Sequence, residues 1–158
     1  MSTEGAGNQG MWQAVKSKLG GLFGSGLSAE RKMEVEVTFG LIGFLAKSDG
    51  LITSYESEFT NQLLDHLELN LDGRAIAMAA YDAGRTKGFD VESTAARFTG
   101  QYPLGSDAFE RLFESLLRLS LSDGRVYPRE REALVRLATA FGLTEKQLDQ
   151  RMANIVPH

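Results

Sequence analysis

The chain has 158 residues, of which 42% are hydrophobic, so it is long enough for one domain with a core of its own. A net charge of −4, with mixed signs and no long basic run, argues against nucleic acid as a main partner. The absence of cysteine excludes disulfides, thiolate catalysis and cysteine-based zinc sites, and it is typical of a reducing compartment.

The first 26 residues are predicted to form a flexible segment with one short amphipathic helix. Residues 1–10 are polar and glycine-rich and lack the features of a secretory signal, so we expect a cytoplasmic protein. Residues 11–23 place their apolar side chains on one helical face, beside Lys16 and Lys18. Two lysines and a short apolar face support at most weak contact with the inner face of the membrane. We therefore favour docking of this helix onto the bundle or onto a partner chain.

The remainder of the chain, residues 27–156, is predicted to form one all-α domain. Apolar residues recur there at helical spacing, and no alternating pattern typical of a strand is found. Start signals, including the capping boxes Thr53-x-x-Glu56 and Thr144-x-x-Gln147, divide this region into about seven helices. The seven expected helices, in chain order, are: one from Ser28 to about Ser48; one that begins at Thr53; one over about 71–85; one over about 91–99; one from Ser106 to Gly124; one that begins at Pro128; and one from Thr144 to about Asn154.

Four of these helices carry an apolar stripe on one face, as expected of helices that surround a common core. We expect the stripes to be buried against one another. The predicted core residues are Met33, Val37, Leu41, Ile42, Leu45, Phe59, Leu63, Leu64, Leu67, Phe109, Leu112, Phe113, Leu116, Leu117, Leu134, Leu137, Ala138 and Phe141.

An internal repeat relates two of the helix pairs, because Asp123 lies 74 residues after Asp49 in the same context. The same offset maps Gly50, Glu56, Glu58, Leu63, Leu69 and Phe39 onto Gly124, Glu130, Glu132, Leu137, Leu143 and Phe113. Each copy is an apolar helix, an acidic turn (residues 48–58 or 122–132) and a capped second helix. A lone helix hairpin cannot bury its apolar face, so we expect the two hairpins to pack around a pseudo-twofold axis.

The acidic residues of the two turns allow two interpretations. Turn chemistry alone explains the glycines and the first glutamate of each copy, so the turns can be purely structural. It explains Asp49 and Asp123 less well, because a carboxylate at a helix C-terminus faces the negative end of the helix dipole. A divalent cation, Ca²⁺ or Mg²⁺, would relieve that repulsion. The candidate metal ligands are Asp49, Glu56, Asp123 and Glu130.

The surroundings of the two turns differ in charge. Arg125, Arg129 and Arg131 surround the second turn and offer its acids internal ion pairs, whereas only Lys47 is close in sequence to the first. The first turn is therefore the better candidate for a cation. The spacing of the acids is not that of an EF-hand, since the D-x-[DN]-x-[DN]-G pattern is absent.

Three segments resemble a known family. "SDGLITSYESEF" and "SDGRVYPREREAL" are similar to the turn signature of TerB-like domains, the tellurite-resistance family. The intervening "AMAAYDAGRTKGFDVESTAARF" resembles the version in the DjlA co-chaperone subfamily, including a Y-x-x-G-R element at Tyr81 to Arg85. The likeness covers about residues 28–154 and implies an all-helical, internally symmetric domain. It also implies a link to stress response and divalent cations, no established reaction, and signature acids at the four candidate ligands.

The sequence departs from the DjlA pattern in two respects. A J domain needs a His-Pro-Asp tripeptide, and the only histidines, His66 and His158, do not provide one. No apolar run approaches the ~20 residues of a transmembrane anchor. We therefore expect neither feature in this chain.

No catalytic motif is found. The chain lacks a phosphate-binding loop, a dinucleotide fingerprint and a recognisable nucleophile motif. Two functions outside enzymology remain open. One is a stress-associated module that binds a divalent cation through its acidic turns. The other is a protein-binding adaptor or co-chaperone-related scaffold in which those turns are structural.

Overall fold

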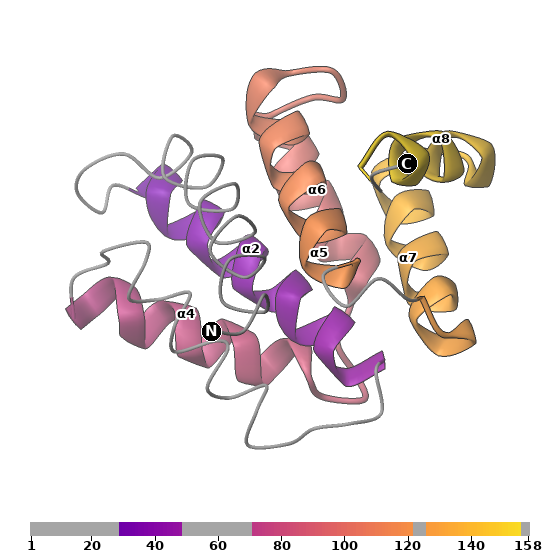
Figure 1. Cartoon of the computed structure of the whole chain (residues 1–158). Coiled ribbons are helices and arrows are strands. Elements are labelled where there is room, and N and C mark those ends of the chain that lie inside the picture. The colour runs from indigo at the N-terminus through magenta and orange to yellow at the C-terminus, as the bar shows by residue number, and fades with distance from the viewer. Residues whose placement is uncertain (1–28, 49–70, 122–125, 156–158) are drawn as a thin grey trace, which may run out of the picture.

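The computed structural model describes residues 29–48, 71–121 and 126–155 (Figure 1). These residues form six helices and no strand, which confirms the predicted all-α fold class. None of the six helices is long and apolar enough to cross a membrane. The helices are α2 (Ala29–Ser48), α4 (Leu71–Gly84), α5 (Val91–Gln101), α6 (Asp107–Ser120), α7 (Pro128–Phe141) and α8 (Glu145–Ile155).

Several sequence predictions fall outside the described residues. They include the flexible segment over residues 1–26, the helix after Thr53 and the core positions on that helix. The division into a segment of residues 1–26 and a domain of residues 27–156 therefore stays a prediction. The total of about seven helices stays a prediction for the same reason.

Side-chain caps fix the starts of three helices. Ser106 and the Thr144 box act as predicted. Ser106 Oγ accepts a hydrogen bond from the backbone N–H of Phe109 at 3.3 Å. In the box, Gln147 Oε1 accepts from the backbone N–H of Thr144 at 2.8 Å, and Thr144 Oγ1 accepts from the backbone N–H of Gln147 at 3.1 Å. Asp90 caps α5 in the same way but was not predicted. α6 ends at Ser120, earlier than the predicted stop at Gly124.

α2 is the central helix and is buried on several sides. It contacts α4, α5, α6 and α7, and Figure 1 shows it between α4 and the remaining helices. The predicted stripe on α2 was too narrow, because Val35 and Phe39 are buried as completely as Val37 and Leu41. A helix that is apolar nearly all round is typical of such an interior position.

Glycines allow α2 and α4 to approach each other closely. A Cβ added to Gly43 would overlap the carbonyl oxygen of Tyr81, and a Cβ added to Gly84 would overlap that of Gly40. Tyr81 is buried, and the guanidinium carbon of Arg85 lies 5.5 Å from the centre of its ring. The Y-x-x-G-R element is therefore a packing element that joins the end of α4 to α2.

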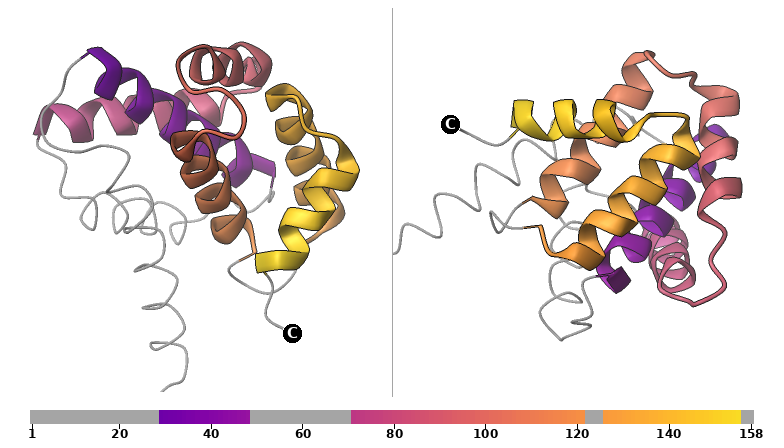
Figure 2. Two further views of the ribbon diagram at one scale, coloured as in Figure 1. Left: turned by 90° about the horizontal axis from the view of Figure 1, so that it is seen from above. Right: turned by 90° about the vertical axis from the view of Figure 1, so that its right-hand side faces the viewer.

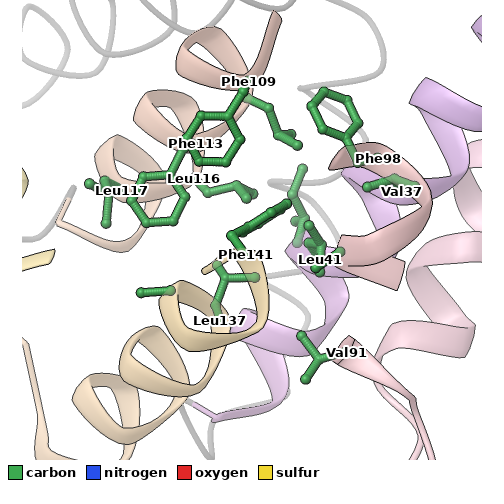
Figure 3. Close-up of a cluster of buried hydrophobic side chains, with 14 of the residues drawn as sticks. Val37, Leu41, Val91, Phe98, Phe109, Phe113, Leu116, Leu117, Leu137 and Phe141 are labelled. Carbon is green, nitrogen blue, oxygen red and sulfur yellow. The ribbon is translucent and has the colours of Figure 1, made fainter. Parts of the chain in front are cut away.

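Three phenylalanines from α6 and α7 form the aromatic centre of the core. The rings of Phe109 and Phe113 are stacked with centroids 5.6 Å apart, and Phe141 meets both edge-on at 5.2 and 5.9 Å. Figure 3 shows these side chains pointing toward one another and toward Leu41 of α2. Such pairs contribute ~0.5–1.5 kcal/mol each beyond the area they bury.

α8 crosses α7 and also contacts α6 (Figure 2). The crossing requires a sharp turn after α7, and Gly142 provides it with a φ of +97°, in the left-handed region that glycine adopts without strain. The N–H of Leu143 then bonds the carbonyl oxygen of Ala138 at 2.8 Å. This turn places Leu148 of α8 fully in the core.

The internal repeat is tested only in part. α2 and α6 correspond under the 74-residue offset, and the matched Phe39 and Phe113 are both fully buried. The helix that would correspond to α7 lies outside the described residues. Superposition of the two hairpins on a pseudo-twofold axis therefore stays a prediction.

Candidate functional site

Of the four predicted metal ligands, the structure describes only Glu130. Asp49, Glu56 and Asp123 lie outside the described residues, so their separation from Glu130 is not tested. In the part of the chain that is described, no group of three or more histidine, aspartate or glutamate side chains could hold a metal ion. The cation site on the acidic turns therefore stays a proposal.

Glu130 acts as a helix cap. It lies in the first turn of α7 with 8% of its surface exposed, and its Oε1 accepts a hydrogen bond from the backbone N–H of Tyr127 at 3.4 Å. Pro128 occupies the first helical position, where its missing N–H leaves no donor unsatisfied. This is the role that turn chemistry predicts for Glu130, and it requires no metal.

Glu132, the acid of the second turn that matches Glu58 in the repeat, lies in a different environment. It is exposed on α7 and lines a hollow of about 390 Å³, which we call the basic groove. Three elements form the groove: the end of α2, the loop between α4 and α5, and the first turns of α7, which lie together in Figure 1. Its charged lining comprises Lys47, Lys87, Arg129, Arg136 and Glu132.

Two aromatic rings form the apolar part of the basic groove. The centroids of Phe44 and Phe89 are 6.1 Å apart, and the guanidinium carbon of Arg136 lies 5.6 Å from the centre of the Phe44 ring. Arg136 also pairs with Glu92 across a distance of 3.3 Å, where both side chains are about half exposed. Arg136 is therefore held over the ring by two weak contacts.

The other three cations of the groove are not neutralised by the described part of the chain. Lys47, Lys87 and Arg129 form no ion pair with any carboxylate in residues 29–48, 71–121 or 126–155. The described lining of this small hollow thus holds four cations and one carboxylate, in a protein whose net charge is −4. The local charge is opposite in sign to that of the whole molecule, which favours an anionic ligand.

A second hollow, between α6 and α8, is neutralised internally. It measures about 420 Å³, and its charged lining among the described residues comprises Asp107, Glu110, Glu114, Arg111 and Arg151. Arg151 holds the Glu110 carboxylate with both terminal guanidinium nitrogens. Nη1 donates to Oε2, and Nη2 donates to Oε1 at 3.0 Å. This hydrogen bonding lowers the pKa of Glu110 and raises the pKa of Arg151. The pair joins α8 to α6 and leaves little net charge for a ligand.

Glu34 is a buried carboxylate that the sequence analysis did not single out. Only 2% of its surface is exposed, and it accepts from the Tyr102 hydroxyl and from Nη1 of Arg31 at 3.3 Å. The contact with Tyr102 joins α2 to the residue that follows α5. The local sequence "MEVEV" does not distinguish Glu34 from an exposed helical glutamate. Its hydrogen-bond partner Tyr102 is 68 residues away in the sequence.

Comparison with known families identifies the domain. A family model described as "Tellurite resistance protein TerB" matches residues 36–153. This chain belongs to the TerB family. The match covers both acidic turns and nearly all of the six described helices, and it confirms the assignment made from the two turn signatures and the Y-x-x-G-R element.

The curated relatives are co-chaperones, which confirms the likeness to the DjlA subfamily. "Co-chaperone protein DjlA" of Vibrio cholerae is 30% identical over 134 residues, 84% of this chain and 47% of that protein. The Photobacterium profundum protein of the same name is 29% identical over 126 residues, 79% of this chain and 46% of that protein. The chain thus spans less than half the length of these relatives. No solved structure matches it significantly.

Proposed function

We propose that this TerB-family chain is a co-chaperone-related protein-interaction module with no reaction of its own. The observation that carries the proposal is the match of 84% of the chain to a protein named as a co-chaperone. The described charges agree with it. Glu130 caps a helix, Glu110 and Glu34 join helices, and three cations that form no ion pair with another described residue line a surface groove. Such an arrangement suits binding rather than acid–base chemistry.

A domain exchange tests this function. The matching half of the V. cholerae co-chaperone would be replaced by residues 28–155 of this chain, and the refolding of a denatured client by its chaperone would be measured. We expect the exchange protein to retain a substantial part of the co-chaperone activity. The control carries an unrelated all-α bundle of similar length. A folded exchange protein that is no more active than this control would refute the proposal.

Binding of Ca²⁺ or Mg²⁺ is a second proposal, supported by the repeated acids of the two turns. Asp49 and Glu56 are the favoured ligands, with Asp123 and Glu130 in the second copy. We expect saturable binding by calorimetry, weakened at least tenfold, or about 1.4 kcal/mol, by Asp49→Asn combined with Glu56→Gln. An absence of saturable binding at millimolar ion in the wild type would leave the turns with a structural role alone.

A further inference from the structure

We propose that the basic groove binds an acidic peptide segment of a partner protein, with an apolar side chain of that segment placed against Phe44 and Phe89. The inference rests on the proposed function and specifies the surface through which the module would act. The groove measures about 390 Å³, within the ~300–1,000 Å³ typical of sites that enclose a small ligand. That volume suits one or two side chains of an extended segment and is too small to enclose a folded domain.

The charges of the groove determine the chemistry of the occupant. Lys47 comes from the end of α2, Lys87 from the loop between α4 and α5, Arg129 from the first turn of α7 and Arg136 from the middle of α7. Because these four cations lie on three elements, they can contact several carboxylates along a chain. Among the described residues of the lining, Glu132 is the one carboxylate that opposes them. Charge-assisted hydrogen bonds to carboxylates are stronger than neutral ones, so the acids of a peptide would supply binding energy and orientation together.

The cations of the groove are also accessible. Lys87 and Arg129 are exposed, and together with Lys47 they form no ion pair within the described residues. Arg151 in the α6–α8 hollow differs in this respect, because Glu110 already holds it with two hydrogen bonds. A ligand of the α6–α8 hollow would have to break that pair, whereas Lys47, Lys87 and Arg129 can bind an anion without breaking any ion pair of the described residues. This contrast selects the basic groove over the other hollow.

The apolar part of the groove distinguishes a peptide from other anions. Phe44 and Phe89 lie beside the cations, so an acidic segment that carries an aromatic or aliphatic residue satisfies both parts of the lining. Aromatic and arginine side chains are enriched at protein interfaces for this reason. A long polyanion such as nucleic acid, or an anionic membrane, would in addition meet the surrounding surface of a protein with net charge −4. Charge complementarity therefore favours a short acidic peptide.

Fluorescence anisotropy on the 158-residue chain tests the proposal. The probe is a fluorescein-labelled peptide with the core Glu-Asp-Phe-Glu-Glu between glycine and serine linkers. We expect saturable binding that weakens as salt is added, because the contacts are partly exposed ion pairs. A second peptide replaces every acid by its amide, and a third replaces phenylalanine by alanine. Each should bind at least tenfold more weakly than the first.

Two matched double variants locate the binding surface. Lys87→Glu with Arg129→Glu reverses two charges of the groove, and Lys32→Glu with Lys146→Glu reverses two exposed charges outside it. Both change the net charge equally, so any difference between them is local. We expect at least a tenfold loss of affinity in the groove variant and less than twofold in the control. All four positions are exposed, and circular dichroism checks that the variants fold.

Three results would overturn the proposal. The first is equal loss in both double variants, and the second is equal binding of the amide peptide. The third is displacement of the peptide by an oligonucleotide, or by vesicles containing phosphatidylserine, that binds more tightly than the peptide does. The domain exchange is a separate readout. An active exchange protein whose groove binds no acidic peptide would refute the groove assignment alone, whereas peptide binding without exchange activity would refute the proposed function.

Discussion

At the scale of single residues, Glu130 shows how a signature acid can be explained by local structure. Its carboxylate lies in the first turn of α7 and accepts the backbone N–H of Tyr127, the residue that precedes the helix. An acid at this position also faces the positive end of the helix dipole. Both effects stabilise the helix without a bound ion. A cation that used Glu130 would therefore have to share a carboxylate that is already part of a cap.

Substitution of Glu130 tests whether its carboxylate stabilises α7 as a cap. Glu130→Ala removes the cap and should lower the free energy of unfolding by ~1 kcal/mol, a typical value for loss of a capping side chain. Glu130→Gln keeps an acceptor of the same length and should have a smaller effect. Exposed Glu132→Ala on the same helix is the control and should change stability little. Urea unfolding measures all three. An equal loss in the glutamine and alanine variants would argue against the cap.

Residues whose role depends on distant partners could not be predicted. Ser106 and Thr144 were identified as caps because their partners lie three residues along the chain. Glu34 was missed, since Tyr102 is distant in sequence. The basic groove was missed for the same reason: Lys47, Lys87 and Arg129 come from three separate segments, and each alone resembles an ordinary solvated charge.

At the scale of elements, the contact between α2 and α4 depends on backbone proximity. Gly43 and Gly84 face carbonyl oxygens of the opposite helix, which cannot move aside as a flexible side chain can. The end of α4 and the following loop therefore have a fixed position relative to α2. This matters for the basic groove, because Lys87 follows α4 closely while Lys47 and Phe44 belong to α2.

Gly84→Ala tests this contact. The added methyl group would overlap the carbonyl oxygen of Gly40, so we expect a loss of ~1–3 kcal/mol or more, the range typical of overpacked cores. The matched control is Gly100→Ala in α5, where a Cβ meets no atom within 4 Å. Alanine should stabilise that helix by up to ~1 kcal/mol. Thermal unfolding measures both. A Gly84→Ala protein as stable as the wild type would mean that the helices do not approach this closely.

The helices were easier to predict than their packing. The start of α7 at Pro128 and the bounds of α2 and α8 follow from caps and apolar spacing, which are local signals. The single predicted stripe on α2 was wrong in extent because periodicity cannot show how many neighbours surround a helix, and Val35 and Phe39 are buried by contacts with other elements. α6 ends at Ser120 and not at the predicted stop, Gly124, because a glycine marks where a helix can end but does not show that the helix extends that far.

At the scale of the whole molecule, the described helices form a bundle in which α2 joins α4 to the α5–α8 group. The end of α2, the loop after α4 and the start of α7 meet at the basic groove. The groove thus lies where the parts of the bundle are connected. A TerB-family domain of this kind presents a positive surface in a protein that is negative overall.

The central claim is that this chain is an interaction module that acts through the basic groove. The most direct measurement repeats the domain exchange into the V. cholerae co-chaperone with the two matched double variants. We predict that Lys87→Glu with Arg129→Glu lowers the co-chaperone activity of the exchange protein at least tenfold, while Lys32→Glu with Lys146→Glu leaves it within twofold of the unsubstituted exchange protein. Equal activity of the two folded variants would contradict the account.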